Sequence, residues 1–185
     1  MHRFSRPLAV GLLVLSSGLA AAAESKPRRP RVLADLPPPI YAATLGPITA
    51  SPSTISFSAT DPDVVPNVSG NSAATVSWSI TSGGSPSQTW TLTVQAPVSS
   101  FSSCSTVPVS AVTVRCASAS VTGGGGSGSC RPAFTRSTSP QTVASGKEGN
   151  NHTVTINFNL ADTWKCVAAQ SPACTSTITY TVNAP

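Results

Sequence analysis

From Ile55 onward, apolar and hydroxyl residues alternate along the chain in six separate runs. Within each run the apolar residues share one parity, and serine or threonine fills most of the positions between them. Because successive side chains of a strand point to opposite faces, this period of two predicts strands with one buried and one solvated face. The apolar positions are Ile55 and Phe57; Val76, Trp78 and Ile80; Trp90, Leu92 and Val94; Val112, Val114 and Cys116; Val154, Ile156, Phe158 and Leu160; and Ile178, Tyr180 and Val182.

Segments rich in glycine or proline separate these runs and predict turns or loops. They cover residues 83–86, 123–128 and 146–149. No run has the 3.6-residue period of an amphipathic helix. The spacing predicts a single Ig-like antiparallel β-sandwich of about seven strands over residues 47–185, with a β-barrel as the alternative.

The N-terminal residues have the composition of a secretory signal peptide. Arg3 and Arg6 precede an apolar stretch over residues 8–15, and small residues follow up to Ala23. The apolar stretch is short and interrupted by glycine and serine, which disfavours a retained membrane anchor. We therefore expect cleavage after Ala23 and export of the remaining chain to the extracellular space, the cell surface or the periplasm, with no transmembrane anchor after cleavage.

Charge is concentrated near the N-terminus. The formal net charge is +5, but residues 47–185 hold five basic and four acidic residues and are almost neutral. Residues 24–46 contain Lys26, Arg28, Arg29 and Arg31 among several prolines, which predicts an extended basic linker or N-terminal arm. The arm has no aromatic residue between its basic ones, so nucleic acid is not an expected partner.

The chain has five cysteines, an odd number that predicts two disulfides and one free thiol in an exported protein. The first expected pair is Cys104 with Cys116, across a hairpin-like segment. For Cys174 two partners stay open, Cys130 and Cys166. No Cys-x-x-Cys motif is present, so no zinc site is expected.

Candidate catalytic groups are few. After cleavage the one histidine is His152, which we expect at the surface at the start of a strand, and no Gly-x-Ser-x-Gly motif is present. Asp61 and Asp63 are the only two nearby carboxylates. They could supply oxygens to a calcium ion, although aspartates beside proline also form turns. This inventory favours a non-enzymatic protein without a cofactor or resident metal.

The three tryptophans differ in their context. Trp78 and Trp90 share the parity of the apolar residues around them, which predicts positions in the core. Trp164 follows the end of an alternating run and is the candidate for an exposed ring that stacks on a sugar.

Two segments resemble the WxL domains, wall-attachment modules of some Gram-positive surface proteins. The sequence Trp90-Thr91-Leu92-Thr93-Val94, after a polar turn, resembles their first Trp-x-Leu motif. Residues 177–185 resemble their closing strand, with Tyr180 in place of a second tryptophan and Val182 in place of a leucine. The resemblance, from about Ile48 to Pro185, implies an all-β module attached non-covalently to peptidoglycan. Trp90, Leu92 and Tyr180 then join Trp164 as candidate ligand-binding residues.

The sequence thus predicts a non-enzymatic, secreted or cell-surface binding module whose partner is a cell-wall polysaccharide or a surface protein. The alternative is a structural subunit of a surface fibre or coat. In that case an N-terminal extension such as residues 32–48 would lend a strand to the sheet edge of a neighbour. Self-assembly that disappears when residues 24–46 are deleted would distinguish the alternative.

Overall fold

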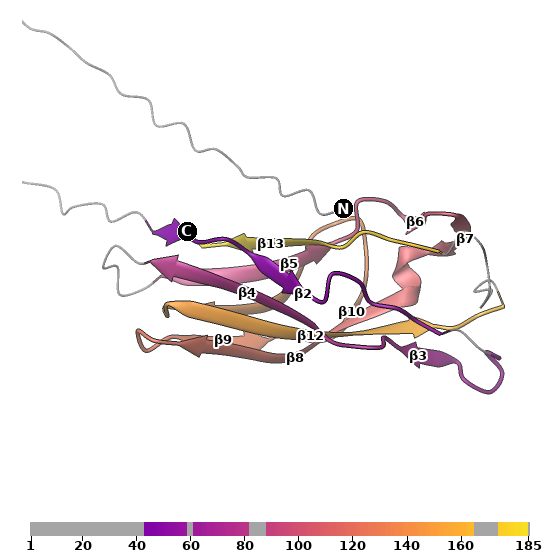
Figure 1. Ribbon diagram of the computed structural model, residues 1–185, viewed down its shortest axis with the longest axis horizontal. Helices are drawn as coiled ribbons and strands as arrows, with labels where there is room; N and C mark the ends of the chain where they lie inside the picture. The colour runs from indigo at the N-terminus through magenta and orange to yellow at the C-terminus, as the bar shows by residue number, and fades with distance from the viewer. Residues whose placement is uncertain (1–42, 59–60, 82–87, 165–173, 185) are drawn as a thin grey trace, which may run out of the picture. The chain divides into compact units, whose positions relative to one another are not determined.

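The computed structural model describes residues 43–58, 61–81, 88–164 and 174–184. The regular structure of these residues consists of thirteen β-strands and one short 3-10 helix. The strands form two antiparallel sheets and a small hairpin, and the inward residues of both sheets share one apolar core (Figure 1). The fold is therefore an all-β sandwich, as the alternation predicts.

The first sheet has seven strands. Its main path is β1 (Thr44–Leu45), β4 (Ala74–Thr81), β12 (Asn151–Ala161), β8 (Val112–Thr122) and β10 (Phe134–Thr135). Two short strands lie off this path: β2 (Thr49–Ser51) pairs with β4, and β3 (Asn67–Ser69) pairs with β12. The sheet begins at Thr44, before the expected domain boundary at residue 47.

The second sheet has four strands in the order β13 (Thr179–Asn183), β5 (Thr89–Gln95), β11 (Gln141–Lys147) and β9 (Ser127–Cys130). The separate hairpin joins β6 (Ser100–Phe101) to β7 (Cys104–Pro108), and the 3-10 helix Val109–Ala111 leads from β7 into β8. None of the described segments forms a helix of the length and apolarity that a membrane crossing requires.

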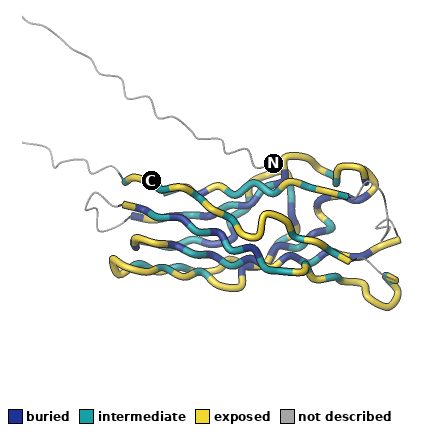
Figure 2. The backbone as a smooth tube through the Cα atoms, viewed as in Figure 1, coloured by how far each residue is buried: buried dark blue, intermediate teal, exposed yellow. Residues whose placement is uncertain are grey.

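Most of the predicted strands are confirmed, and the parity within them is correct. Figure 2 shows buried positions alternating with more exposed ones along the central strands. The even-numbered apolar residues of β4, β5 and β12 are all buried, as are the three predicted apolar residues of β8. Serine and threonine occupy the outer face, where the Ser77 and Thr153 hydroxyls lie 3.3 Å apart.

One predicted run does not form a strand. Ile55 and Phe57 pack against the core, but residues 54–58 have no strand partner. The backbone of Ser56 bonds to Asn71 instead: its N–H donates to the Asn71 side-chain oxygen at 2.9 Å, and its carbonyl accepts the Asn71 N–H at 2.9 Å. Asn71 therefore takes the place of a neighbouring strand, through its side-chain oxygen and its own backbone N–H.

Two segments expected as loops contribute strand residues. Ser127 and Gly128 belong to β9, and Gly146 and Lys147 belong to β11. Glycine is required at 146 because a Cβ at this position would lie 2.0 Å from the Ser127 carbonyl oxygen and 2.5 Å from the Trp90 ring. Glycine thus marks a close approach between a strand backbone and a large ring rather than a turn.

The disulfide pairing differs from the expected one. Cys104 bonds to Cys174 and Cys116 bonds to Cys130, each with a Cα–Cα distance of 5.4 Å. The prediction of a Cys104–Cys116 bridge is wrong because the 3-10 helix after β7 redirects the chain, so β7 and β8 do not form a hairpin. Both predicted partners of Cys174 are also wrong, because Cys174 bonds to Cys104 and Cys130 bonds to Cys116. Cys166 itself lies outside the described residues.

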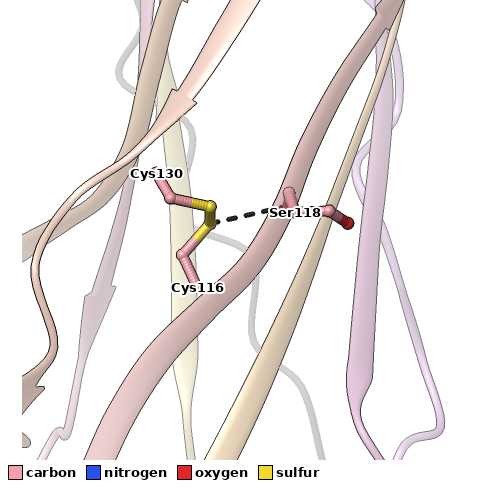
Figure 3. The surroundings of a disulfide bond; sticks show 3 residues. All are labelled: Cys116, Ser118 and Cys130. Atoms are coloured by element: carbon pink, nitrogen blue, oxygen red, sulfur yellow. Dashed lines mark hydrogen bonds between the residues drawn. A yellow bond between two sulfur atoms is a disulfide. The ribbon is translucent and has the colours of Figure 1, made fainter.

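Each disulfide joins segments that no continuous ladder connects. Cys116–Cys130 links β8 of the first sheet to β9 of the second (Figure 3). In the same view the Cys116 sulfur lies 3.5 Å from the Ser118 carbonyl oxygen. Cys104–Cys174 fastens β7 to the segment that precedes β13. Two disulfides indicate an oxidising compartment.

Candidate functional site

Two of the residues proposed as ligand contacts lie in the core. Trp90 is 1% exposed and Leu92 is fully buried, because both belong to the inward face of β5. The core position predicted for Trp90 from its parity, and likewise for Trp78, is confirmed. A direct ligand contact by Trp90 or Leu92 is therefore wrong for this structure, since neither side chain reaches the surface.

Trp78 and Trp90 enclose a histidine. His152 stacks on Trp78 with a ring-centroid distance of 5.1 Å and meets Trp90 edge-on at 5.2 Å. The two tryptophans are themselves in edge contact at 5.2 Å. The expectation that His152 lies at the surface is wrong, because the residue is 1% exposed. Its parity, shared with Val154 and Ile156, is the signal that indicates burial.

The surroundings of His152 keep it neutral. Burial lowers the pKa of His152 below its ordinary value of 6.5, and a hydrogen bond to the Gly149 carbonyl opposes this in part. That bond, 3.2 Å long, fixes the proton on Nε2, which donates to the carbonyl oxygen. Nδ1 and the two indole nitrogens are buried, and no described residue forms a hydrogen bond with them. The three rings are almost completely buried, so the cluster serves as a structural element of the core.

Trp164 lies at the surface, as predicted, with 71% of its area exposed. It follows the end of β12, where the Asp162 N–H donates to the Pro66 carbonyl at 2.9 Å. This bond places the 61–66 turn beside the turn that carries Trp164. Val64 in the same region is 74% exposed. The end of the sandwich beyond β3 and β12 therefore presents an aromatic and an aliphatic side chain to solvent.

The 61–66 turn explains the two neighbouring aspartates. The Asp63 N–H donates to the Asp61 side-chain oxygen at 3.0 Å, and the Val65 N–H donates to the Asp61 carbonyl at 2.8 Å. This is the aspartate turn that we weighed against a calcium site. Asp61 thus positions Val64 and Val65 at the surface.

A shallow hollow of about 340 Å³ lies on the outer face of the first sheet beside β3. Its lining is mostly polar and includes Ser69, Ser72, Arg115, Asn157 and Asn159. The Ser69 hydroxyl donates to the Asn159 side-chain oxygen at 2.9 Å, which connects β3 to β12 across the hollow. Within the described part of the chain the Arg115 guanidinium makes no ion pair. The hollow thus offers hydroxyl, amide and one cationic donor group at the surface.

The sequence did not predict the hollow, because the hollow forms where two strands that are distant in the chain lie side by side. Asn157 and Asn159 have the outward parity of β12, and Arg115 has the outward parity of β8, where it faces Asn157 across the ladder. The pairing of β8 with β12 was not predictable from spacing. The outward parity of a lone arginine among hydroxyl residues is the signal that could have singled out Arg115.

Tyr180, the remaining predicted ligand contact, is half-buried and does not line the hollow. It belongs to β13, and burial raises its pKa to about 12. Arg136 is 3% exposed, and burial lowers its pKa to about 10. The Arg136 guanidinium donates to the Ser176 hydroxyl at 2.9 Å and to the Thr177 carbonyl, both just before β13. Arg136 and Tyr180 therefore hold the last strand in place.

No family model, curated protein or solved structure matches this chain. The resemblance to WxL domains consequently stays a prediction. The features that bear on function are the hollow and the exposed apolar side chains at the same end of β12. Of the predicted ligand-binding residues, only Trp164 belongs to this region.

Proposed function

We propose that this chain is a non-enzymatic, exported binding module that attaches to a cell-wall glycan through the outer surface of β3 and β12. This β3–β12 surface consists of Ser69, Ser72, Arg115, Asn157, Asn159 and Trp164. The observation that carries the proposal is the polar hollow whose lining includes the Arg115 guanidinium. An alternative function, assembly with other copies, depends on a different part of the molecule.

The chemistry of the surface suits a wall glycan. Serine hydroxyls and asparagine amides donate to and accept from sugar hydroxyls and N-acetyl groups. A guanidinium pairs with a carboxylate in a bidentate geometry, and wall glycans carry carboxylates. The exposed Trp164 ring offers an apolar face to the C–H groups of a sugar. Export is supported by the predicted signal peptide and by the two disulfides.

The test is co-sedimentation of residues 24–185 with purified peptidoglycan sacculi at low and high salt. Arg115→Gln and Trp164→Ala are expected to remove most of the salt-resistant binding. Arg131→Gln is the matched control for the charge change, since Arg131 is also exposed but lies outside the hollow. Val98→Ala is the control for loss of an exposed apolar side chain.

Each result has a separate meaning. An equal loss of binding in Arg115→Gln and Arg131→Gln would show that the interaction is a general attraction between charges. Binding that disappears at high salt, or when residues 24–31 are deleted, would assign it to the basic arm. Absence of binding to sacculi from both Gram-positive and Gram-negative sources would overturn the proposal.

A further inference from the structure

Among the described residues, strand β13 forms one edge of the second sheet. It is hydrogen-bonded to β5 along one side, and no described strand pairs with its other side. Its five residues, Thr179–Asn183, include no charge and no proline. Charged residues, proline and short length are the usual means by which an edge strand avoids pairing with another chain. β13 has neither a charge nor a proline, and its five residues are enough to pair with a further strand.

The other described edges of the two large sheets are short or covered. β1, β2, β3 and β10 have two or three residues each. β9, at the opposite edge of the second sheet, is covered by β8: the Cys116–Cys130 bridge joins them, and a Cβ at Gly128 would lie 2.8 Å from the Ala119 carbonyl oxygen. In the separate hairpin β7 has the same length as β13, but it ends in Pro108, so β13 is the longest uncovered edge of the two large sheets in the described structure and the one without proline.

The β13 edge is also held in a fixed position. The segment before it is fastened by the Cys104–Cys174 disulfide, by a pair of backbone bonds between Ser102 and Thr175, and by Arg136. Within β13, Val182 is 7% exposed and anchors the strand to the core. A fixed edge binds an added strand without first having to be ordered, which favours association.

We infer that β13 accepts residues 32–36 of a second copy of this chain as an additional strand. This segment, Val-Leu-Ala-Asp-Leu, has the same number of residues as β13 and contains no proline. Pro37, Pro38 and Pro39 follow it and cannot donate to a ladder, so they end the paired segment. The sequence predicted a donor strand within residues 32–48. Its C-terminal part is not available to a neighbour, because Thr44–Leu45 pairs with the chain's own β4, as does Thr49–Ser51 just beyond it.

The geometry favours a second copy over the chain's own arm. Thr44 pairs with Thr81, and Asn183 pairs with Thr91, so the arm joins the sandwich at the end where β13 finishes. Residues 32–36 paired with the chain's own β13 directly beyond this point would run parallel to it, because both would run toward the same end of the sandwich. Every described pairing in the second sheet is antiparallel, and a second copy is free to pair in that way. Because donor and acceptor are different surfaces, the contact propagates head to tail into an open assembly.

Sedimentation velocity of residues 24–185 over a range of concentrations tests the inference. The unmodified chain is expected to associate with rising concentration, and Ala34→Pro is expected to stay monomeric because proline removes a donor from the middle of the added strand. Ser25→Pro is the matched control: it places a proline in the same arm outside residues 32–36 and is expected to associate normally. A chain that is monomeric at every concentration, or an Ala34→Pro variant that still associates, would overturn the inference.

The acceptor is tested by complementation and by hydrogen exchange. Thr181→Pro disrupts the β13 edge but keeps the arm, whereas Ala34→Pro keeps the edge. A mixture of the two is expected to form a one-to-one complex that neither forms alone.

In the associated wild type, backbone amides of 179–183 are expected to exchange more slowly than in Ala34→Pro, a readout that does not require Thr181→Pro to fold. Slow exchange in a monomer would assign the edge to the chain's own arm, and unchanged exchange in an associated state would exclude β13; both overturn the inference. None of these results depends on glycan binding.

Discussion

At one end of the sandwich three aromatic rings pack in the core, whereas the other end is fastened by a disulfide and leaves Val64 and Trp164 exposed to solvent. The first end holds Trp78, Trp90 and His152, near the start of β12. The second holds β6, β7 and β3, which lie together at the right of Figure 1, with the Cys104–Cys174 bridge and the exposed Trp164. Packing excludes side chains from solvent, but a covalent bond stabilises a segment without doing so. The disulfide-linked end can therefore present apolar side chains to a ligand.

The largest effect is expected at the aromatic end. Trp90→Ala removes a ring that contacts both Trp78 and His152, and it is expected to lower the free energy of unfolding by about 3–5 kcal/mol. Denaturant unfolding followed by circular dichroism measures the change. A loss below about 1 kcal/mol would show that this cluster does not stabilise its end of the sandwich.

At the opposite end, the disulfide is expected to contribute about 2–4 kcal/mol through the entropy of the unfolded chain. Cys104→Ser with Cys174→Ser opens a loop with a sequence separation of 70 residues, whereas Cys116→Ser with Cys130→Ser opens one of 14. The logarithmic dependence on loop length predicts that the first pair costs about 1.4 kcal/mol more. Thermal unfolding of the two double variants compares them directly. The reverse order would mean that native-state contacts, not loop entropy, decide the contribution.

The fold was largely predictable because period-two alternation reflects burial on one face, and nearly every alternating run is a strand. β11 was missed since alanine, serine and glycine replace the bulky residues that mark a strand, and Gly146 is required there by the Trp90 ring. The disulfide pairs and the hollow were not predictable. Both arise where segments far apart in the chain meet, as Cys174 meets Cys104 and Arg115 meets Asn157. Local spacing carries no information about such contacts.

A smaller effect is expected from pH, again at the aromatic end. Burial lowers the pKa of His152 in the folded state, so the unfolded chain binds a proton more readily below pH 6.5. The contribution of the neutral His152 to the free energy of unfolding is therefore fully present above pH 6.5. It decreases as the pH falls from 6.5 toward the lowered pKa, by at most about 1.4 kcal/mol per pH unit. Urea unfolding at neutral and mildly acidic pH measures the slope. In His152→Gln the slope over this range is expected to shrink, and an unchanged slope would assign the effect to other groups.

The smallest effect on stability is expected where the effect on binding is largest. Trp164 is 71% exposed, so Trp164→Ala is expected to change the free energy of unfolding by no more than about 0.5 kcal/mol. Sedimentation with sacculi is expected to decrease in the same variant, because the ring is available to a ligand and contributes little to the core. Trp164→Phe, which keeps an aromatic face, is expected to retain part of the binding. A destabilisation by Trp164→Ala as large as that by Trp90→Ala would mean that tryptophan packing stabilises both ends of the sandwich. The proposal that Trp164 is exposed for binding would then lose its support.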